Sequence, residues 1–580
     1  MNINKLQTDY VKELNKEKPW DVYPRPQLVR DSYINLNGYF DYKITTNEGI
    51  VGDFDGKILV PFPIESSLSE VEKTLNENEY IYYKKDVTIP SEFVKDKLFL
   101  HFGAVDQETT IYVNDKYVGE NKGGYIPFKF DIKNYIKLTD DKKEYNFKLV
   151  VRVKDNIDLK YPYGKQTKSR GGMWYTPVSG IWQTVWLESV NNEYIESIKI
   201  TPNIDDSTIN IKLFSSCKEF VIEIYDENEN YNNLISSNYI NTKDITIKLQ
   251  NPILWSPENP HLYGIKVKTN ADEIKSYFGM RKVSIVEFNG KKVLALNNKP
   301  FFFNGVLDQG CFPDGLFLPA TINGYIDDIR SMKKLGFNTL RKHIKVEPLI
   351  WYYLCDKMGM IVWQDMVNNS LYSFFKDTVL PTIGRKRRCD KKVKIPLENK
   401  EIFISHMKKT VELLYNNPSI VLWTIFNEGW GQFESKRMEK LLLEVDSTRL
   451  IDPTSGWFEQ PDSKINSLHI YFKKLKIKKK NVPIILSEFG GYSYKINEHS
   501  YNLDKTYGYK FYTEQDKFEK AYVSLFENEL IPLIKDGLCA SIYTQVSDVE
   551  DETNGILTYD RKICKLNKEV IKKVNEKVKY

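Results

Sequence analysis

Two patterns of apolar and polar residues divide the chain near residue 290. From about residue 30 to 190, apolar and polar residues alternate at period two with frequent turn signals, which predicts an antiparallel, jelly-roll-like β-sandwich. A second, shorter strand series predicts an immunoglobulin-like β-sandwich over residues 191–287. Helical periodicity is weak in both segments, so we expect residues 1–190 and 191–287 to form two all-β domains.

After about residue 290, short apolar strands alternate with amphipathic helices. The strands include "KPFFFNGV", "IVLWTIFNE" and "VPIILSEFG", and the helices include "YIDDIRSMKKLG" and "EIFISHMKKTVELLYNN". Eight strands of this kind predict a (β/α)8 TIM barrel over residues 288–580. The sequence therefore predicts a multidomain protein in which the barrel follows the two sandwiches.

Composition and charge limit the location and the partners. The 580 residues carry a net charge of only +5, which does not suggest a nucleic-acid or membrane partner. Basic runs at 385–392 and 473–481 lack interleaved aromatic residues, so we interpret them as solvated loops. No apolar signal segment or membrane-length apolar run is present, and we expect a cytoplasmic location. The six cysteines show no disulfide or metal-site spacing.

Two glutamates stand at the carboxyl ends of predicted barrel strands. Glu428 follows "VLWTIFN", Glu488 follows "VPIILS", and a glycine comes within two residues of each. Because barrel chemistry lies at the carboxyl ends of the strands, the two carboxylates should share one mouth. Such a pair suits glycoside hydrolysis, in which one group protonates the leaving oxygen and the other attacks or activates water. The separation of the two groups, and with it retention or inversion, stays open at this point.

The segment "NNPSIVLWTIFNEGWGQF" resembles the acid/base region of glycoside hydrolase family 2, the β-galactosidase and β-glucuronidase family, and "LSEFGG" resembles its nucleophile strand. Similar stretches extend over nearly the whole chain, including "GGMWYTPVSGIWQTVWLESV" in the first sandwich and "LWSPENPHLYGIKV" in the second. The resemblance implies a sugar-binding type of first domain and a retaining mechanism. Glu428 would then be the acid/base and Glu488 the nucleophile.

The same resemblance suggests further site residues. Asn427 would bind the sugar 2-hydroxyl, and Arg341 would hold the nucleophile ionised. His343 could contact sugar hydroxyls or form a strand-end ion pair. Asp308 could grip sugar hydroxyls or cap a turn. The other candidates, for contacts to the nucleophile or for lining the sugar pocket, are Tyr471, His469, Asp365, Trp430, Trp457, Tyr543 and Gln545.

The predicted function is a retaining exo-β-glycosidase, and β-galactosidase is its most frequent form in the family. Strand eight offers Tyr543 and Gln545 where familiar relatives present a tryptophan, which leaves β-xylosides, α-L-arabinopyranosides and β-mannosides open. Asn554 is followed by glycine and isoleucine instead of the Asn-x-Lys element of glucuronidases, which argues against a β-glucuronide. A carbohydrate-binding pseudoenzyme is the alternative from another class.

We expect a carbohydrate substrate and no metal or other cofactor. Some large galactosidases of the family use Mg2+ or Na+, but the sequence presents no dedicated ligand set for either ion. No nucleic-acid or membrane partner is expected, and a homo-oligomer is left open.

Overall fold

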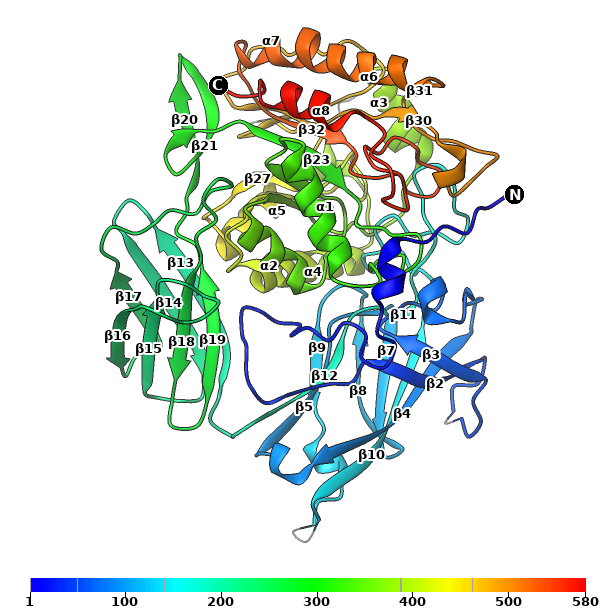
Figure 1. The fold of residues 1–580 in the computed structure, drawn as a ribbon, viewed down its shortest axis with the longest axis vertical. Helices are drawn as coiled ribbons and strands as arrows, with labels where there is room; N and C mark the ends of the chain where they lie inside the picture. The colour runs from blue at the N-terminus through cyan, green and yellow to red at the C-terminus, as the bar shows by residue number, and fades with distance from the viewer. Residues whose placement is uncertain (1, 50, 140–141, 386–388, 462) are drawn as a thin grey trace.

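A computed structural model describes residues 2–49, 51–139, 142–385, 389–461 and 463–580. Lys386, Arg387 and Arg388, within the basic run predicted to be a solvated loop, lie outside the described residues. Figure 1 shows a barrel at the top, an immunoglobulin-like sandwich at the lower left and a larger sandwich at the bottom. The predicted multidomain fold is confirmed.

The first sandwich is built mainly from two antiparallel sheets. One has the strand order β3-β2-β4-β10-β7-β8 and the other the order β1-β12-β5-β9. Apolar residues that alternate along the strands, such as Phe40, Leu100 and Val151, meet in one buried core between the sheets. The strands are β1 (Tyr33–Asn35), β2 (Gly38–Thr45), β3 (Gly56–Val60), β4 (Tyr80–Pro90), β5 (Lys97–Phe102), β7 (Glu108–Val113), β8 (Lys116–Lys122), β9 (Phe128–Asp131), β10 (Glu144–Lys154) and β12 (Val185–Val190).

The second sandwich is smaller and pairs a three-stranded sheet with a four-stranded sheet. Its core is rich in isoleucine, a β-branched residue that suits a half-buried strand. The sheets contain β13 (Ile195–Asn203), β14 (Thr208–Ser215) and β17 (Asp244–Lys248), and β15 (Phe220–Tyr225), β16 (Leu234–Ile240), β18 (Tyr263–Lys268) and β19 (Glu273–Phe278).

A hairpin of β20 (Val283–Phe288) and β21 (Lys291–Leu296) connects this sandwich to the barrel. Val293 and Leu294 of the hairpin share a buried cluster with Phe303 and Trp363 of the barrel strands. Trp363 is therefore part of the barrel core.

Eight parallel strands form the barrel sheet, in the order β27-β26-β25-β24-β23-β32-β29-β28. The order follows the chain as in a TIM barrel, and consecutive strands are hydrogen-bonded neighbours except β27 and β28, which stand at the two ends of the order. The strands are β23 (Phe303–Asp308), β24 (Thr339–Lys342), β25 (Ile361–Asp365), β26 (Ile420–Thr424), β27 (Leu450–Asp452), β28 (Asn466–Ile470), β29 (Ile484–Gly490) and β32 (Leu538–Thr544).

The helix layer is less regular than the predicted repeat. The described residues between β27 and β28, and between β28 and β29, contain no helix. The second of these connections is lysine-rich, "KKLKIKKKNVP", and offers no apolar stripe with which a helix could cover the barrel. The covering helices are α1 (Asn323–Lys334), α2 (Leu349–Met358), α4 (Leu397–Leu414), α5 (Ser435–Val445), α6 (Gln515–Ser524) and α8 (Lys568–Asn575).

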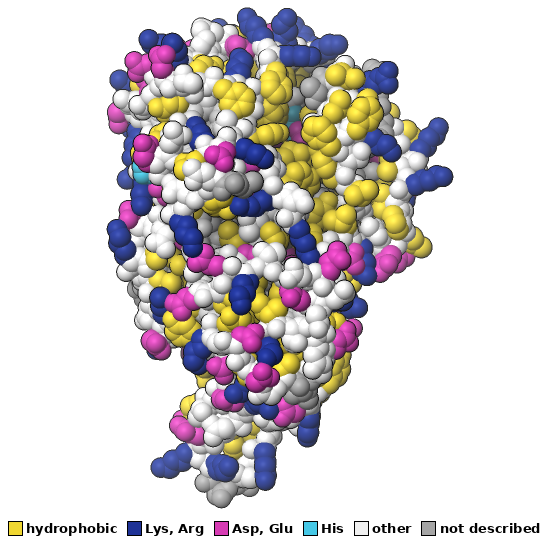
Figure 2. Space-filling model, turned by 90° about the vertical axis from the view of Figure 1, so that its right-hand side faces the viewer, with side chains coloured by type: hydrophobic (Ala, Val, Ile, Leu, Met, Phe, Trp, Pro, Cys, Tyr) yellow, Lys and Arg dark blue, Asp and Glu magenta, His cyan; other side chains and the backbone are white. Residues whose placement is uncertain are grey.

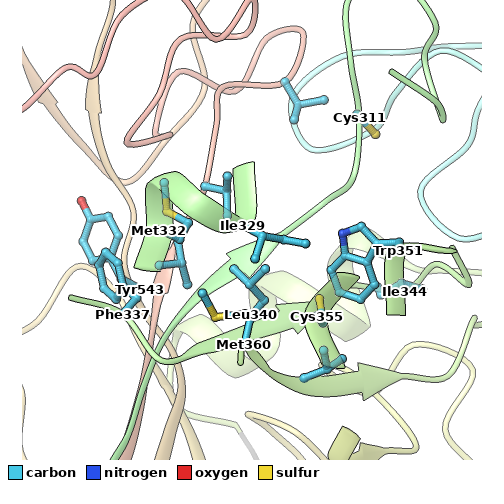
Figure 3. Packing of buried hydrophobic residues seen from close by; sticks show 14 of the residues in the cluster. Cys311, Ile329, Met332, Phe337, Leu340, Ile344, Trp351, Cys355, Met360 and Tyr543 are labelled. Carbon is cyan, nitrogen blue, oxygen red and sulfur yellow. The ribbon is translucent and has the colours of Figure 1, made fainter. Parts of the chain in front are cut away.

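The layer between helices and strands is packed with large apolar side chains. Ile329 and Met332 of α1 lie against the layer that contains Leu340 and Tyr543, as Figure 3 shows. Burying each such side chain contributes roughly 1.5–3 kcal/mol. This packing fixes the strands and with them the side chains at their carboxyl ends.

All six cysteines lie among the described residues and are unpaired, as their spacing indicates. Among the described helices, none combines the length and the apolar character that a membrane span requires.

Candidate active site

Glu428 and Glu488 meet at the carboxyl end of the barrel. Glu488 lies within β29, whereas Glu428 lies beyond β26 in a turn with a φ of 52°. The backbone N–H of Glu428 donates to the carbonyl of Ser455 (2.9 Å), which holds this turn against the segment after β27. Both side chains are buried. One oxygen of each carboxylate and one ring nitrogen of His469 all lie within 4.8 Å of one another.

The carboxylate of Glu488 has two donors. Arg341 Nη1 donates to Oε1 (3.1 Å), and the hydroxyl of Tyr471 donates to Oε2. Burial raises the pKa of Glu488, and the neighbouring His469 and Arg341 oppose that shift. The site thus encloses a carboxylate and supplies groups that favour its ionised form.

Arg341 is the centre of the buried polar network. Its Nε donates to both oxygens of Asp365 (3.0 and 3.1 Å), and its Nη2 donates to Oδ1 of Asn427 (2.8 Å). Burial alone would raise the pKa of Asp365, but Arg341 and His343 hold that pKa below its usual value. One guanidinium therefore positions both Glu488 and the amide beside Glu428.

Two histidines complete the network. The Nδ1 atom of His469 lies 2.8 Å from Glu428 Oε1, and its Nε2 atom lies 3.0 Å from the hydroxyl of Ser455. The Nδ1 atom of His343 lies 2.8 Å from Asp365. Burial, aided by the charge of Lys165, lowers the pKa of His343 to about 3, so its ring is neutral near pH 7.

Three residues that the sequence suggested lie outside this network. Asp308 pairs with Lys342 (2.7 Å) and accepts from the N–H of Gly310 (2.8 Å), which is the turn-capping alternative. The ring of Tyr543 packs against Phe489 in the outer apolar layer (Figure 3). Gln545 is hydrogen-bonded to Gln309, Glu552 and Asn554 on the loop side of the barrel.

Aromatic rings form one wall of the mouth. Trp430 stacks on Trp174 of the first sandwich with 5.4 Å between ring centroids, and Tyr372 meets Trp430 edge-on. Trp457 packs edge-on against His469. On another side, residues that the sequence reading missed include Tyr509, which stacks on Tyr471 at 3.6 Å, and Tyr507 beside it.

A segment of the first sandwich, residues 156–178, reaches the mouth. The hydroxyl of Tyr163 donates to the carbonyl of Ser370 (2.9 Å), and the hydroxyl of Tyr175 donates to Glu552 (3.0 Å). Trp174 lies next to Tyr175 in this segment. The site therefore includes side chains from two domains.

The rim of the mouth is apolar. Figure 2 shows hydrophobic side chains around a hollow in the upper part of the molecule. The segment that carries Tyr372 also exposes three large apolar side chains, and the segments that carry Tyr471 and Tyr509 each expose a phenylalanine. These exposed residues are Leu371, Phe374, Phe375, Phe472 and Phe511.

Glu428, His469 and Glu488 also form the one group of three ligating side chains, among the described residues, with the spacing of a cation site. These three groups are the two glutamates that the sequence predicts to be catalytic and the imidazole between them. Their spacing suits either a cation site or a pair of carboxylates that act together on a substrate. That no metal is required stays a prediction.

Family models cover most of the chain. The model described as "Glycosyl hydrolases family 2, sugar binding domain" matches residues 53–190, "Glycosyl hydrolases family 2" matches 193–281, and "Glycosyl hydrolases family 2, TIM barrel domain" matches 286–580. The chain belongs to glycosyl hydrolase family 2. The predicted resemblance is confirmed.

The similar characterised proteins are distant relatives. A β-galactosidase of Thermoanaerobacter pseudethanolicus is 27% identical over 65% of this chain and 48% of its own length. A β-galactosidase of Leuconostoc mesenteroides is 25% identical over 77% of this chain and 44% of its own length. A β-glucuronidase of Streptococcus agalactiae is 25% identical over 70% of this chain and 68% of its own length. The chain thus spans less than half the length of these two galactosidases.

Among solved structures, the β-glucuronidase of Ruminococcus gnavus superposes with a TM-score of 0.73. The match covers 97% of this chain and 100% of that one, at 16% identity. At this identity the similarity establishes the fold but does not show which sugar the protein recognises.

Proposed function

We propose that the protein is a retaining β-glycosidase that removes a terminal sugar by double displacement. The observation that carries the proposal is the pair Glu428 and Glu488 at one mouth, with an oxygen of each within 4.8 Å. Retaining enzymes hold their carboxyl groups about 5–5.5 Å apart, whereas inverting enzymes leave roughly 6.5–9.5 Å for a water molecule. The short separation favours retention.

The contacts of the two carboxylates suggest their roles. Glu488 has a guanidinium and a phenol as donors, which suits the nucleophile that attacks the anomeric carbon. Glu428 would protonate the leaving oxygen as the glycosyl ester with Glu488 forms. In the second step Glu428 would deprotonate water, which attacks the same carbon and releases Glu488. Asn427, oriented by Arg341, would bind the sugar 2-hydroxyl as the resemblance implies.

The sugar that we propose is a neutral β-galactoside. Curated relatives named as β-galactosidases support this choice. The loop after β32 also carries Glu550, Asp551 and Glu552, all buried, and a uronic acid would add a further carboxylate close to them. The second candidate is a β-glucuronide, which is favoured by the relative named β-glucuronidase. The remaining neutral glycosides stay alternatives, and the cytoplasmic location stays a prediction.

A panel of nitrophenyl glycosides tests the proposal. The purified protein would be assayed with β-galactoside, β-glucuronide, β-xyloside, β-mannoside, β-glucoside and α-L-arabinopyranoside. We expect turnover of the β-galactoside and a fall of about 10⁴-fold or more in kcat for Glu488→Gln, because the nucleophile is lost. Glu498→Gln, an exposed glutamate outside the site, is the matched control. Turnover of the glucuronide instead would replace the proposed sugar, and silence across the panel would favour a pseudoenzyme.

A further inference from the structure

Lys165 of the first sandwich is half-buried, and its ammonium group has no hydrogen-bond partner among the described residues. Its side chain is only 10% exposed, and no hydrogen bond to its ammonium group is found among the described residues. Its recorded contacts are the face of Tyr175, at 5.3 Å from the ring centroid, and Glu552 Oε1 at 3.9 Å. An ammonium group has three donors, and among the described residues none of those of Lys165 meets an acceptor at hydrogen-bond distance. A bound ligand could therefore accept a hydrogen bond from the Lys165 ammonium group.

Glu552 presents a matching acceptor. Its Oε2 atom accepts from Tyr175 (3.0 Å) and from Nε2 of Gln545 (2.6 Å). For Oε1, the described residues supply no hydrogen bond, and the Lys165 ammonium at 3.9 Å is too distant to make one. Two donors thus fix the carboxylate in place while one of its oxygens stays available.

The pair lies beside the catalytic network. Lys165, Tyr175 and His343 line one small cavity, and the charge of Lys165 contributes to the lowered pKa of His343. His343 contacts Asp365, which in turn holds Arg341. The network that contains Glu488 and Arg341 thus extends to His343, which shares that cavity with Lys165.

We propose that Lys165 and Glu552 together bind one hydroxyl of the terminal sugar and act as specificity-determining residues. An oxygen can lie about 2.8 Å from both atoms of a pair separated by 3.9 Å, accepting from the ammonium and donating to the carboxylate. A sugar carboxylate at the same point would have no proton to donate and would oppose the charge of Glu552. The inference rests on the proposed glycosidase function and deepens it, because it explains a preference for a hydroxyl over a uronate.

The test compares nitrophenyl β-galactoside with its 4-deoxy and 6-deoxy analogues on the wild type and on Lys165→Met. We expect the wild type to disfavour one deoxy analogue. Lys165→Met should lower kcat/KM for the parent glycoside about 10- to 100-fold, the usual size of a charge-assisted hydrogen bond. The same variant should leave kcat/KM for the disfavoured analogue nearly unchanged, so that the difference between the parent glycoside and the analogue is lost. Lys168→Met, an exposed lysine of the same segment, should behave as the wild type.

Equal losses on the parent and on both analogues would overturn the inference, because a merely structural lysine would affect all three. A wild type that hydrolyses the glucuronide through Lys165 would overturn it in favour of an anion site. Calorimetry distinguishes a failure of this inference from a failure of the glycosidase proposal. It measures the affinities of galactose and of its 4-deoxy and 6-deoxy forms, and therefore tests the same preference without turnover. Wild-type binding that is indifferent to both deoxy positions would then reject the pair on its own.

Discussion

At the scale of single residues, the surroundings of Glu488 decide the pH range in which the site can react. Burial raises the pKa of this carboxyl above its usual value of 4.5, against the influence of His469, Arg341 and the Tyr471 hydroxyl. Nucleophilic attack needs the ionised form, so kcat/KM should fall as the pH drops through that raised pKa. The acidic limb of the profile should therefore lie above the range of an ordinary glutamate.

Removing the Tyr471 hydroxyl should move this limb further. The hydrogen bond from Tyr471 favours the carboxylate, so its loss in Tyr471→Phe raises the Glu488 pKa and shifts the acidic limb of kcat/KM to higher pH. Steady-state rates from pH 4 to 9 would show the shift. Tyr494→Phe is the control and should leave the limb in place, because the Tyr494 ring stacks on Phe518 of helix α6. A limb that stays or moves down in Tyr471→Phe would contradict the assigned role.

At the scale of elements, the phase of each strand determines which side chains enter the site. Fully apolar barrel strands do not reveal from their sequence which alternate residues face inward. Strand ends could be predicted, and Glu428, Glu488, Asn427 and Arg341 do come together. Asp308 and Tyr543 instead lie on the outer side of β23 and β32, among Lys342 and the apolar layer. The connections after β27 and β28 lack helices because sequence periodicity there is absent, a feature that the eightfold pattern concealed.

Gly490 at the end of β29 provides a test at this scale. Its φ is +81°, and a Cβ there would lie 2.4 Å from a ring carbon of Tyr543. Gly290 in the β20–β21 turn has a φ of +70° with open space around it. Both alanine variants should lose about 1–2 kcal/mol from the backbone, and Gly490→Ala about 1–3 kcal/mol more from overpacking.

Urea unfolding midpoints would compare these two variants with the wild type. Activity should fall in Gly490→Ala alone, because the residue lies two positions after Glu488. Equal destabilisation of the two variants, or full activity in Gly490→Ala, would show that the packing of β29 against Tyr543 does not hold the nucleophile.

At the scale of the whole molecule, the site joins two domains. The order of two sandwiches and a barrel could be predicted because each has its own periodicity. The contact of residues 156–178 with the mouth could not be predicted from the sequence. Trp174 and Trp430 are remote in sequence, and their stacking depends on how the domains pack. The same holds for Lys165 and Glu552, whose pairing appears only in the assembled structure. The sequence thus predicted that Glu428 and Glu488 share one mouth, whereas it did not indicate the pairing of Lys165 with Glu552.

Covalent labelling of the nucleophile tests the central claim most directly. The protein would be incubated with an activated 2-deoxy-2-fluoro-β-glycoside of the sugar that it hydrolyses, and the peptides would be sequenced by mass spectrometry. The 2-fluorine slows both steps, so the glycosyl-enzyme should accumulate. We predict one added fluorosugar, attached to Glu488 in "VPIILSEFGG" and absent from Glu488→Gln. An enzyme that turns over the parent glycoside but carries no label, or carries it on another residue, would contradict the retaining mechanism assigned to this pair.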